Sequence, residues 1–230
     1  MSRQYPLRMT EPLVVDDQTR IRRIPERQVT EREQLYAILD AGLVAHVAFV
    51  RDGRPVVIPF LYARDGDSLL LHGSTGGGLF LSPEGVEVSV GVTHVDGLVF
   101  ARTVFDSSAH YRSVVVHGRA VAVPADEKEA ALLVVSEHLM PGRWDEVRAS
   151  TRKELAATSI LRIGLDRASV KVRAYGASEE PDDGEDRAVW AGVLPLSLVA
   201  GAPEPSPSAG GPVPASVTAS AARFPVRSGL

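Results

Sequence analysis

The chain has 230 residues, of which 44% are hydrophobic and 23% charged, and these proportions are those of an ordinary globular protein. They exclude a collagen-like, coiled-coil or wholly disordered chain. The formal net charge is −4, which gives no overall attraction to nucleic acid or to an anionic membrane surface, so we expect neither as a partner.

The sequence contains no cysteine, so disulfides, thiolate metal sites and a cysteine nucleophile are excluded. The first twenty residues carry no apolar run of signal-peptide length, and no run of about eighteen apolar residues occurs. These features predict a soluble, cytoplasmic protein. Residues 1–28 mix arginines with acids and lack an apolar period, which predicts an N-terminal arm.

The first element of the body is a predicted helix from Thr30 to Gly42. Thr30 suits the N-cap, Glu33 would complete a capping box, and Gly42 suits the position just after the helix. Short apolar runs follow, separated by the turn pairs Asp52-Gly53 and Asp65-Gly66, which are typical of β-hairpins. We expect strands over 43–50, 55–62, 68–72, 86–93, 97–104 and 111–123.

After Pro124, an acidic first turn and an apolar stripe predict a helix over 126–139, which Pro141-Gly142 ends. Residues 178–186 hold six acids and predict a solvated loop. The remaining expected elements are a helix over 144–157 and strands over 159–165 and 168–175.

The end of the chain differs in composition, because 21 of residues 201–230 are Pro, Gly, Ser or Ala. This composition predicts a flexible tail. A β-meander followed by helices and final strands, without βαβ alternation, predicts a mainly β (α+β) fold, an antiparallel barrel with flanking helices. We therefore expect an arm at 1–28, a barrel domain at 29–200 and a tail at 201–230.

The six histidines show no metal-ligand spacing, so we expect no metal site. His46 and His138 fall on apolar patterns typical of core or rim residues. His94 and Asp96 stand together in what the sequence indicates is a turn. His72-Gly73-Ser74 is more informative, because an apolar strand ends there in a turn rich in hydroxyls and glycines whose N–H groups can bind a phosphate. An ordinary glycine-rich hairpin loop is the alternative.

Arg112 is the second candidate. Alternation along the strand places it on the face that carries Val114 and Val116, near the strand's beginning. An arginine on an apolar face needs an anion, and either a carboxylate at the barrel rim or a phosphate gripped together with Ser113 would satisfy it.

Tyr62, Phe105, Tyr111 and Trp190 are candidates for contact with a planar ring, although strand aromatics usually belong to the core. The sequence has no Gly-x-Ser-x-Gly elbow and no paired-carboxylate pattern, so serine hydrolase and glycosidase chemistry has no support.

Taken in order, these motifs resemble the flavin-binding pyridoxamine 5′-phosphate oxidase-like superfamily, and most of all its branch that includes nitroimidazole reductases. The resemblance runs from about Arg20 to Ala202. It rests on GRPVVIPFLY (53–62), LHGS (71–74), VDGLVFAR (95–102), HYRSVVVHGRA (110–120), HLMPGRWDEVR (138–148), ELAATSILRI (154–163), ASVKVR (168–173) and WAGVLPL (190–196). It implies a split β-barrel that forms a homodimer, with FMN held between the two subunits.

The resemblance also implies site residues. In nitroimidazole reductases the histidine that matches His72 lies at the active site, so His72 is the candidate catalytic residue. Lys171, Arg173 and Trp190 match positions that recur in this branch and are assigned to the cofactor cleft or the dimer interface. The other implied cofactor-binding residues are Val57, Ile58, Pro59 and Tyr62 along the ring, and His72, Gly73, Ser74, Tyr111, Arg112, Ser113 and Val114 at the ring edge, ribityl chain and phosphate.

Two positions depart from the family's pattern. Gly77 and Gly78 stand where a serine and an arginine would suit a phosphate, and His110 stands where an asparagine is usual. We predict an FMN-dependent oxidoreductase that exchanges a hydride with an unknown small molecule, since the redox chemistry belongs to the flavin. The alternatives are a deazaflavin-dependent reductase of the same fold and a flavin- or haem-binding module without turnover.

Overall fold

The computed structural model describes residues 11–74, 84–176 and 188–225. The predicted acidic loop at 178–186 and the glycines of the turn after Ser74 lie outside these residues. The elements are η1 (Pro25–Arg27), β1 (Gln28–Val29), α1 (Arg32–Ala41), β2 (Val44–Arg51), β3 (Arg54–Asp65), β4 (Ser68–Ser74), β5 (Val86–Phe100), β6 (Ser108–Ala122), α2 (Lys128–Leu139), α3 (Arg143–Glu146), α4 (Arg152–Ala157), β7 (Thr158–Gly164), β8 (Ala168–Arg173), β9 (Gly192–Pro195) and α5 (Ala215–Ala222).

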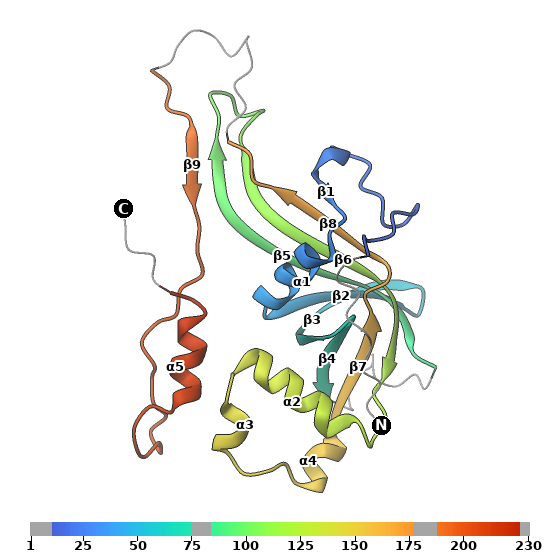
Figure 1. Cartoon of the computed structure of the whole chain (residues 1–230), viewed down its shortest axis with the longest axis vertical. Coiled ribbons are helices and arrows are strands. Elements are labelled where there is room, and N and C mark those ends of the chain that lie inside the picture. Colours follow the sequence, from blue (N-terminus) through green and yellow to red (C-terminus); the bar gives the residue numbers. More distant parts are fainter. Residues whose placement is uncertain (1–10, 75–83, 177–187, 226–230) are drawn as a thin grey trace.

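The described strands form one antiparallel sheet of nine strands in the order β1-β8-β6-β7-β4-β3-β2-β5-β9. An additional pairing of β6 with β5 closes six of them, β2 to β7, into a barrel. β8 extends the wall at β6, and β9 extends it at β5 (Figure 1). The predicted antiparallel split barrel with flanking helices is confirmed.

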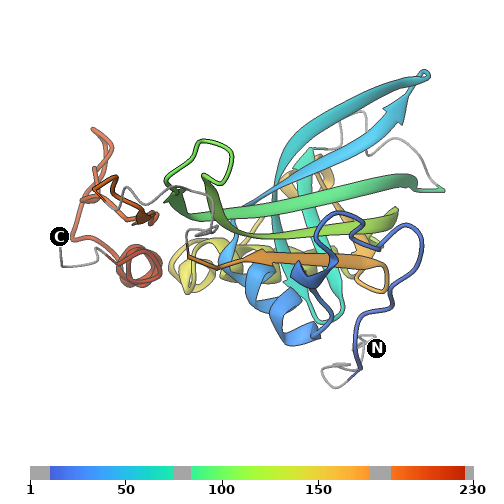
Figure 2. The ribbon, with the colours of Figure 1, turned by 90° about the horizontal axis from the view of Figure 1, so that it is seen from above.

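Turn chemistry sets the β2–β3 hairpin. Asp52 and Gly53 both have positive φ, 51° and 74°, which is the backbone geometry of a two-residue type I′ turn. Arg51 therefore pairs with Arg54, and the register continues to Val44 opposite Leu61. Figure 2 shows the tip of this hairpin rising away from the other strands.

Two hydrophobic clusters hold the barrel together. The larger one fills the interior, and α1 adds the buried side chains of Leu35, Ile38 and Leu39 to it. The smaller one lies between α2 and the outer side of β3, β4 and β7, where Ala63, Leu70 and Ile160 are buried. The helix α2 thus covers only one part of the outer wall.

Three predicted boundaries were wrong. Residues 86–104 were expected to form two strands around a turn, but β5 runs to Phe100 with a β-bulge between Val95 and Gly97. The predicted helix over 144–157 is two short helices, because Thr151 and Glu154 form a capping box that starts α4 anew. The N-cap of α1 is Glu31, one residue after Thr30, and its side chain makes no cap hydrogen bond.

The C-terminal region also differs from the predicted flexible tail. Within 201–225 the chain forms α5, where the Ser216 backbone N–H and hydroxyl donate hydrogen bonds to the Glu146 carboxylate. Arg223 donates to the backbone oxygens of His138 and Asp40, in the last turns of α2 and α1. The many alanines of α5 favour a helix, and the prediction of a flexible tail from composition did not take this preference into account.

The N-terminal residues from Glu11 onward lie along the barrel, as the buried side chains of Leu13 and Thr19 and the pairing of β1 with β8 indicate. No helix in the part of the chain that the structure describes is long and apolar enough to cross a membrane.

We predict that Asp67→Ala destabilises the barrel strongly. The Asp67 carboxylate lies 3.2 Å from a guanidinium nitrogen of Arg32, which is only 3% exposed, and it also accepts a hydrogen bond from the Tyr36 hydroxyl. Removing it leaves a buried cation unpaired, which costs about 3–5 kcal/mol of unfolding free energy. Chemical denaturation monitored by circular dichroism measures this loss.

Glu87→Ala is the matched control, since it removes the carboxylate of the solvent-exposed ion pair with Arg119. It should leave the denaturation midpoint nearly unchanged. Equal midpoint shifts for the two variants would contradict a structural role for the buried pair.

Candidate functional site

The candidate site begins where β3 and β4 part. β3 pairs with β2 over its whole first half, but with β4 only from Leu61 to Asp65. Beyond Leu61, opposite His72, β4 continues through Gly73 and Ser74 against β7 instead. One edge of β3 from Arg54 to Phe60 therefore has no neighbouring strand among the described residues.

The hairpin register determines which backbone groups face that open edge. Since Arg51 and Arg54 flank a two-residue turn, the pairs at Val56, Ile58 and Phe60 bond to β2. Residues 55, 57 and 59 then direct their backbone groups to the open edge. Two of these are prolines without an N–H, so Val57 supplies the edge's N–H donor.

Side-chain alternation sorts the predicted site residues onto two faces. Val57 and Pro59 are exposed on the outer face, and register places His72 on that face beside Leu61. Ser113 pairs with Lys171 and Tyr111 with Arg173, on the outer side of β6 and β8. These two groups are separated by three strand spacings from β3 to β6, roughly 14 Å along the curved sheet.

Four predicted residues have their side chains on the inner face. Tyr62 and Val114 are buried in the core, and Ile58 packs against it. The Tyr62 hydroxyl donates a 2.6 Å hydrogen bond to the backbone oxygen of Leu39, and burial raises the pKa of this phenol. The side chains of Tyr62 and Val114 thus serve the core, and only their backbone could face a ligand.

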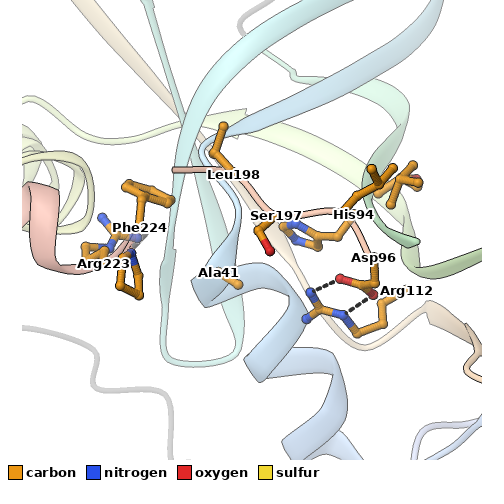
Figure 3. A pocket seen from close by; sticks show the side chains of 12 residues that line it. Ala41, His94, Asp96, Arg112, Ser197, Leu198, Arg223 and Phe224 are labelled. Atoms are coloured by element: carbon orange, nitrogen blue, oxygen red, sulfur yellow. Dashed lines mark hydrogen bonds and ion pairs between the residues drawn. The ribbon is translucent and has the colours of Figure 1, made fainter. Parts of the chain in front are cut away.

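Arg112 is the fourth inner residue, and its anion is a carboxylate. Its guanidinium bonds both oxygens of Asp96, at 2.7 and 2.8 Å (Figure 3). The hydrogen bonds from Arg112 hold the pKa of Asp96 below its usual range. Of the two alternatives that the sequence left open, the structure has the ion pair at the barrel rim.

A pocket of about 410 Å³ adjoins this ion pair. It is lined by Ala41 at the end of α1, by His94, and by Ser197, Leu198 and Arg223 of the C-terminal region (Figure 3). His94 Nε2 lies 2.9 Å from the backbone oxygen of Ile38. Most of the pocket's polar side chains are therefore already engaged within the chain.

His72 lies beside the α2-covered cluster, next in register to buried Ile160. Burial lowers the pKa of its imidazole, so the ring is held neutral at neutral pH. No hydrogen bond to this ring is formed by the described residues. A neutral imidazole beside the parting of β3 and β4 can donate or accept one hydrogen bond to a bound molecule.

Arg173 and Trp190 occupy different surroundings. Arg173 is buried and donates one 3.3 Å hydrogen bond to the backbone oxygen of Ala109, and its Nε has no hydrogen-bond partner in the part of the chain that the structure describes. Burial, and next the charge of Arg27, lower the pKa of Arg173. Trp190 is exposed before β9, with its ring 5.8 Å from that of Phe100, and the single chain does not bring it to His72.

The outer face of the β2–β3 hairpin was not singled out by sequence reasoning. Its exposed residues include Val44, Val50, Val57 and Leu61, which is unusual for a surface in water. The signal was present, since residues 43–50 are apolar at nearly every position, as in strands covered on both faces. His46 interrupts that run.

The sequence model of the pyridoxamine 5′-phosphate oxidase family matches residues 31–172. A curated relative, the uncharacterized protein RA0666 of Rhizobium meliloti (strain 1021), is 28% identical over 100 residues, which are 44% of this chain and 60% of the relative. The chain thus spans less than two thirds of that relative's length.

Solved structures match more fully. The FAD and haem binding protein from Mycobacterium smegmatis is 42% identical, with a TM-score of 0.80, over 85% of this chain and 97% of that chain. The flavocytochrome Anf3 from Azotobacter vinelandii is 32% identical, with a TM-score of 0.85, over 90% and 98%. A 5-nitroimidazole antibiotic resistance protein from Bacteroides thetaiotaomicron, 17% identical with a TM-score of 0.54 over 63% and 86%, shares the fold.

We predict that His72→Gln makes the unfolding free energy less dependent on pH. The folded-state pKa of His72 is depressed, so its contribution to stability is complete above the unfolded value of about 6.5 and is lost as pH falls. Urea denaturation of both proteins between neutral and mildly acidic pH measures the two slopes. His117 and His138 also have depressed pKa values, so the variant should retain part of the slope. Identical slopes would contradict the burial of His72.

Proposed function

Since the chain belongs to the pyridoxamine 5′-phosphate oxidase family, we propose that it is a flavin-binding redox protein that also binds haem. Two extensively matching structures support this, because one is described as binding FAD and haem and the other as a flavocytochrome. We take FAD as the first candidate flavin and the expected FMN as the second, since the 42% identical protein binds FAD.

The observation that carries the flavin proposal is the open edge of β3. A flavin ring has an apolar body and one polar edge on which an N–H lies between two carbonyl oxygens. The edge of β3 offers the N–H and C=O of Val57 and the C=O of Pro55 and Pro59, beside exposed Val57 and Leu61. A site with an apolar surface and a few oriented backbone groups is what such a ring requires.

The flavin's phosphates need donors or cations as well. Ser74 continues β4 away from the open edge, while the guanidinium of Arg112 is occupied by Asp96. We therefore assign the cationic contribution to Lys171, provided by the partner of a homodimer, since Arg173 is only 4% exposed. That arrangement also brings Tyr111, Ser113 and Trp190 of the partner into reach.

Bound flavin supplies hydride and electron transfer, and bound haem supplies one-electron chemistry. The protein's own residues have simpler tasks. Val57 orients the ring, the apolar outer face excludes water, and His72 supplies a neutral hydrogen-bonding group for a small-molecule substrate at the parting of β3 and β4. We propose an oxidoreductase acting on such a molecule, with electron storage or sensing without turnover as the competing function.

We predict that protein purified without added ligand carries both groups. Its absorption spectrum should contain flavin bands and a Soret band, and mass spectrometry of the released flavin should identify FAD or FMN. Protein that binds neither flavin on titration, or that binds a deazaflavin more tightly than either, would contradict the proposal. Oxidation of a nicotinamide donor in the presence of acceptors separates an enzyme from a storage protein.

We predict that Val57→Pro weakens flavin binding while the barrel still folds. Proline removes an N–H that faces the open edge and makes no strand pairing, and losing one such hydrogen bond costs about 0.5–1.5 kcal/mol of binding free energy. Val57→Ala keeps the N–H and controls for the lost side chain. Fluorescence titration of flavin into the flavin-free protein measures the affinities.

Val56→Pro is the structural counterpart, because the backbone of Val56 bonds to Phe49 of β2. It should lower the melting temperature more than Val57→Pro does. Equal flavin affinities for the Val57→Pro and Val57→Ala variants would show that the ring does not bind to this edge.

A further inference from the structure

The outer face of the β2–β3 hairpin is an apolar surface with one polar side chain near its centre. Seven of its eight outward positions are apolar, and the eighth is His46. Seven of the eight are exposed, His46 included, and Ala48 is half-buried. The outward residues are Val44, His46, Ala48 and Val50 on β2, and Pro55, Val57, Pro59 and Leu61 on β3.

All six histidines lie in the described part of the chain, and His46 differs from most of the other five in the hydrogen bonding of its ring. In His94, His110 and His138 the Nε2 atom is hydrogen-bonded to a backbone carbonyl, and in His117 the Nδ1 atom lies 2.9 Å from the Ser89 hydroxyl. The rings of His46 and His72 make no hydrogen bond within the described residues. Of these two, only His46 rises from the middle of the apolar face.

The neighbours of His46 leave space above the sheet. Pro59 lies opposite on β3 and Gly91 opposite on β5. A Cβ atom added to Gly91 would meet only the backbone oxygen of His46, at 3.9 Å. An imidazole bordered by a glycine and a proline can therefore be approached by a wide planar molecule without a clash.

We infer that His46 is the protein ligand of the haem iron, an inference that rests on the proposed haem binding. A neutral imidazole nitrogen donates its lone pair to iron without any other change in bonding. The macrocycle is mostly apolar, so it matches the exposed valines and leucine around His46 better than water does. His46 also stands one strand away from the open edge of β3, roughly 5 Å across the sheet.

The same face could be covered instead by a second copy of the chain. A subunit interface would explain the exposed apolar residues, but it gives no reason for a histidine at their centre whose ring bonds to no described residue. Coordination explains both the apolar surroundings and the free nitrogen.

The test compares haem binding by the wild type with that of His46→Ala, His72→Ala and His117→Ala. Each flavin-loaded protein is titrated with haemin, and the haem content and Soret band are recorded together with the flavin content and the oligomeric state. Removing the hydrogen-bond partner of a metal ligand typically weakens metal binding by roughly 10–100-fold. We expect His46→Ala, which removes the ligand itself, to weaken haem binding by at least this factor. His117→Ala should keep the wild-type spectrum, and loss of the Soret band in His72→Ala but not in His46→Ala would overturn the inference.

His46→Gly with added free imidazole provides a second measurement, because imidazole can enter the space left by the side chain and restore the ligand. Recovery of the wild-type Soret band supports the inference, and unchanged flavin content shows that the variant is folded. The inference would be overturned if His46→Ala kept the wild-type Soret band and haem affinity. It would also be overturned if the only effect of His46→Ala were a change in oligomeric state. Wild-type protein that binds flavin but no haem would overturn the haem part of the proposed function as well.

Discussion

The arrangement of the whole site depends on one constraint, which is that β3 cannot pair with β4 along its entire length. The short turn after Asp65 fixes the register of the two strands, and at His72 β4 stays with β7 while β3 stays with β2. A barrel closed at every position would satisfy all backbone groups and offer no binding edge. Because the strands separate at Leu61, an N–H and three carbonyl oxygens beside an apolar face have no partner strand within residues 11–74, 84–176 and 188–225. The buried cluster beneath the helix α2 includes Ala63 of β3 but not Leu61.

Because side chains alternate between the two faces of a strand, neighbouring residues of one strand have different roles. Along β6, Arg112 and Val114 face the interior while Tyr111 and Ser113 face outward, so one short segment contributes to both the rim ion pair and the outer surface. The Arg112–Asp96 pair joins two strands at the mouth of the barrel, next to the end of α1. A family motif read as one continuous contact with a cofactor is therefore, in three dimensions, two sets of side chains with different roles.

Much of the fold was predictable from local chemistry, while pairings between distant segments were not. Asp52-Gly53 identified the β2–β3 hairpin, and alternation placed Arg112 on the inner face. The sequence did not identify Asp96 as its partner, because Asp96-Gly97 has the composition of a turn and forms a bulge only through the pairing of β5 with β6 and β9. The break between α3 and α4 was likewise missed, since apolar periodicity continues across it and only the Thr151–Glu154 cap interrupts the helix. His46 looked like a core or rim residue because its outward direction depends on the barrel wall around it.

The two prolines of β3 have a consequence beyond ligand binding. An unpaired strand edge in a chain at cellular concentration invites strands of other molecules to add to it, which is a route to aggregation. Pro55 and Pro59 remove two of the three N–H groups that such an incoming strand would need, and their rings obstruct its approach. An edge built in this way is poor at recruiting another polypeptide but still accessible to a small molecule that needs a single donor. The two prolines thus make this edge selective for a small molecule over another polypeptide strand.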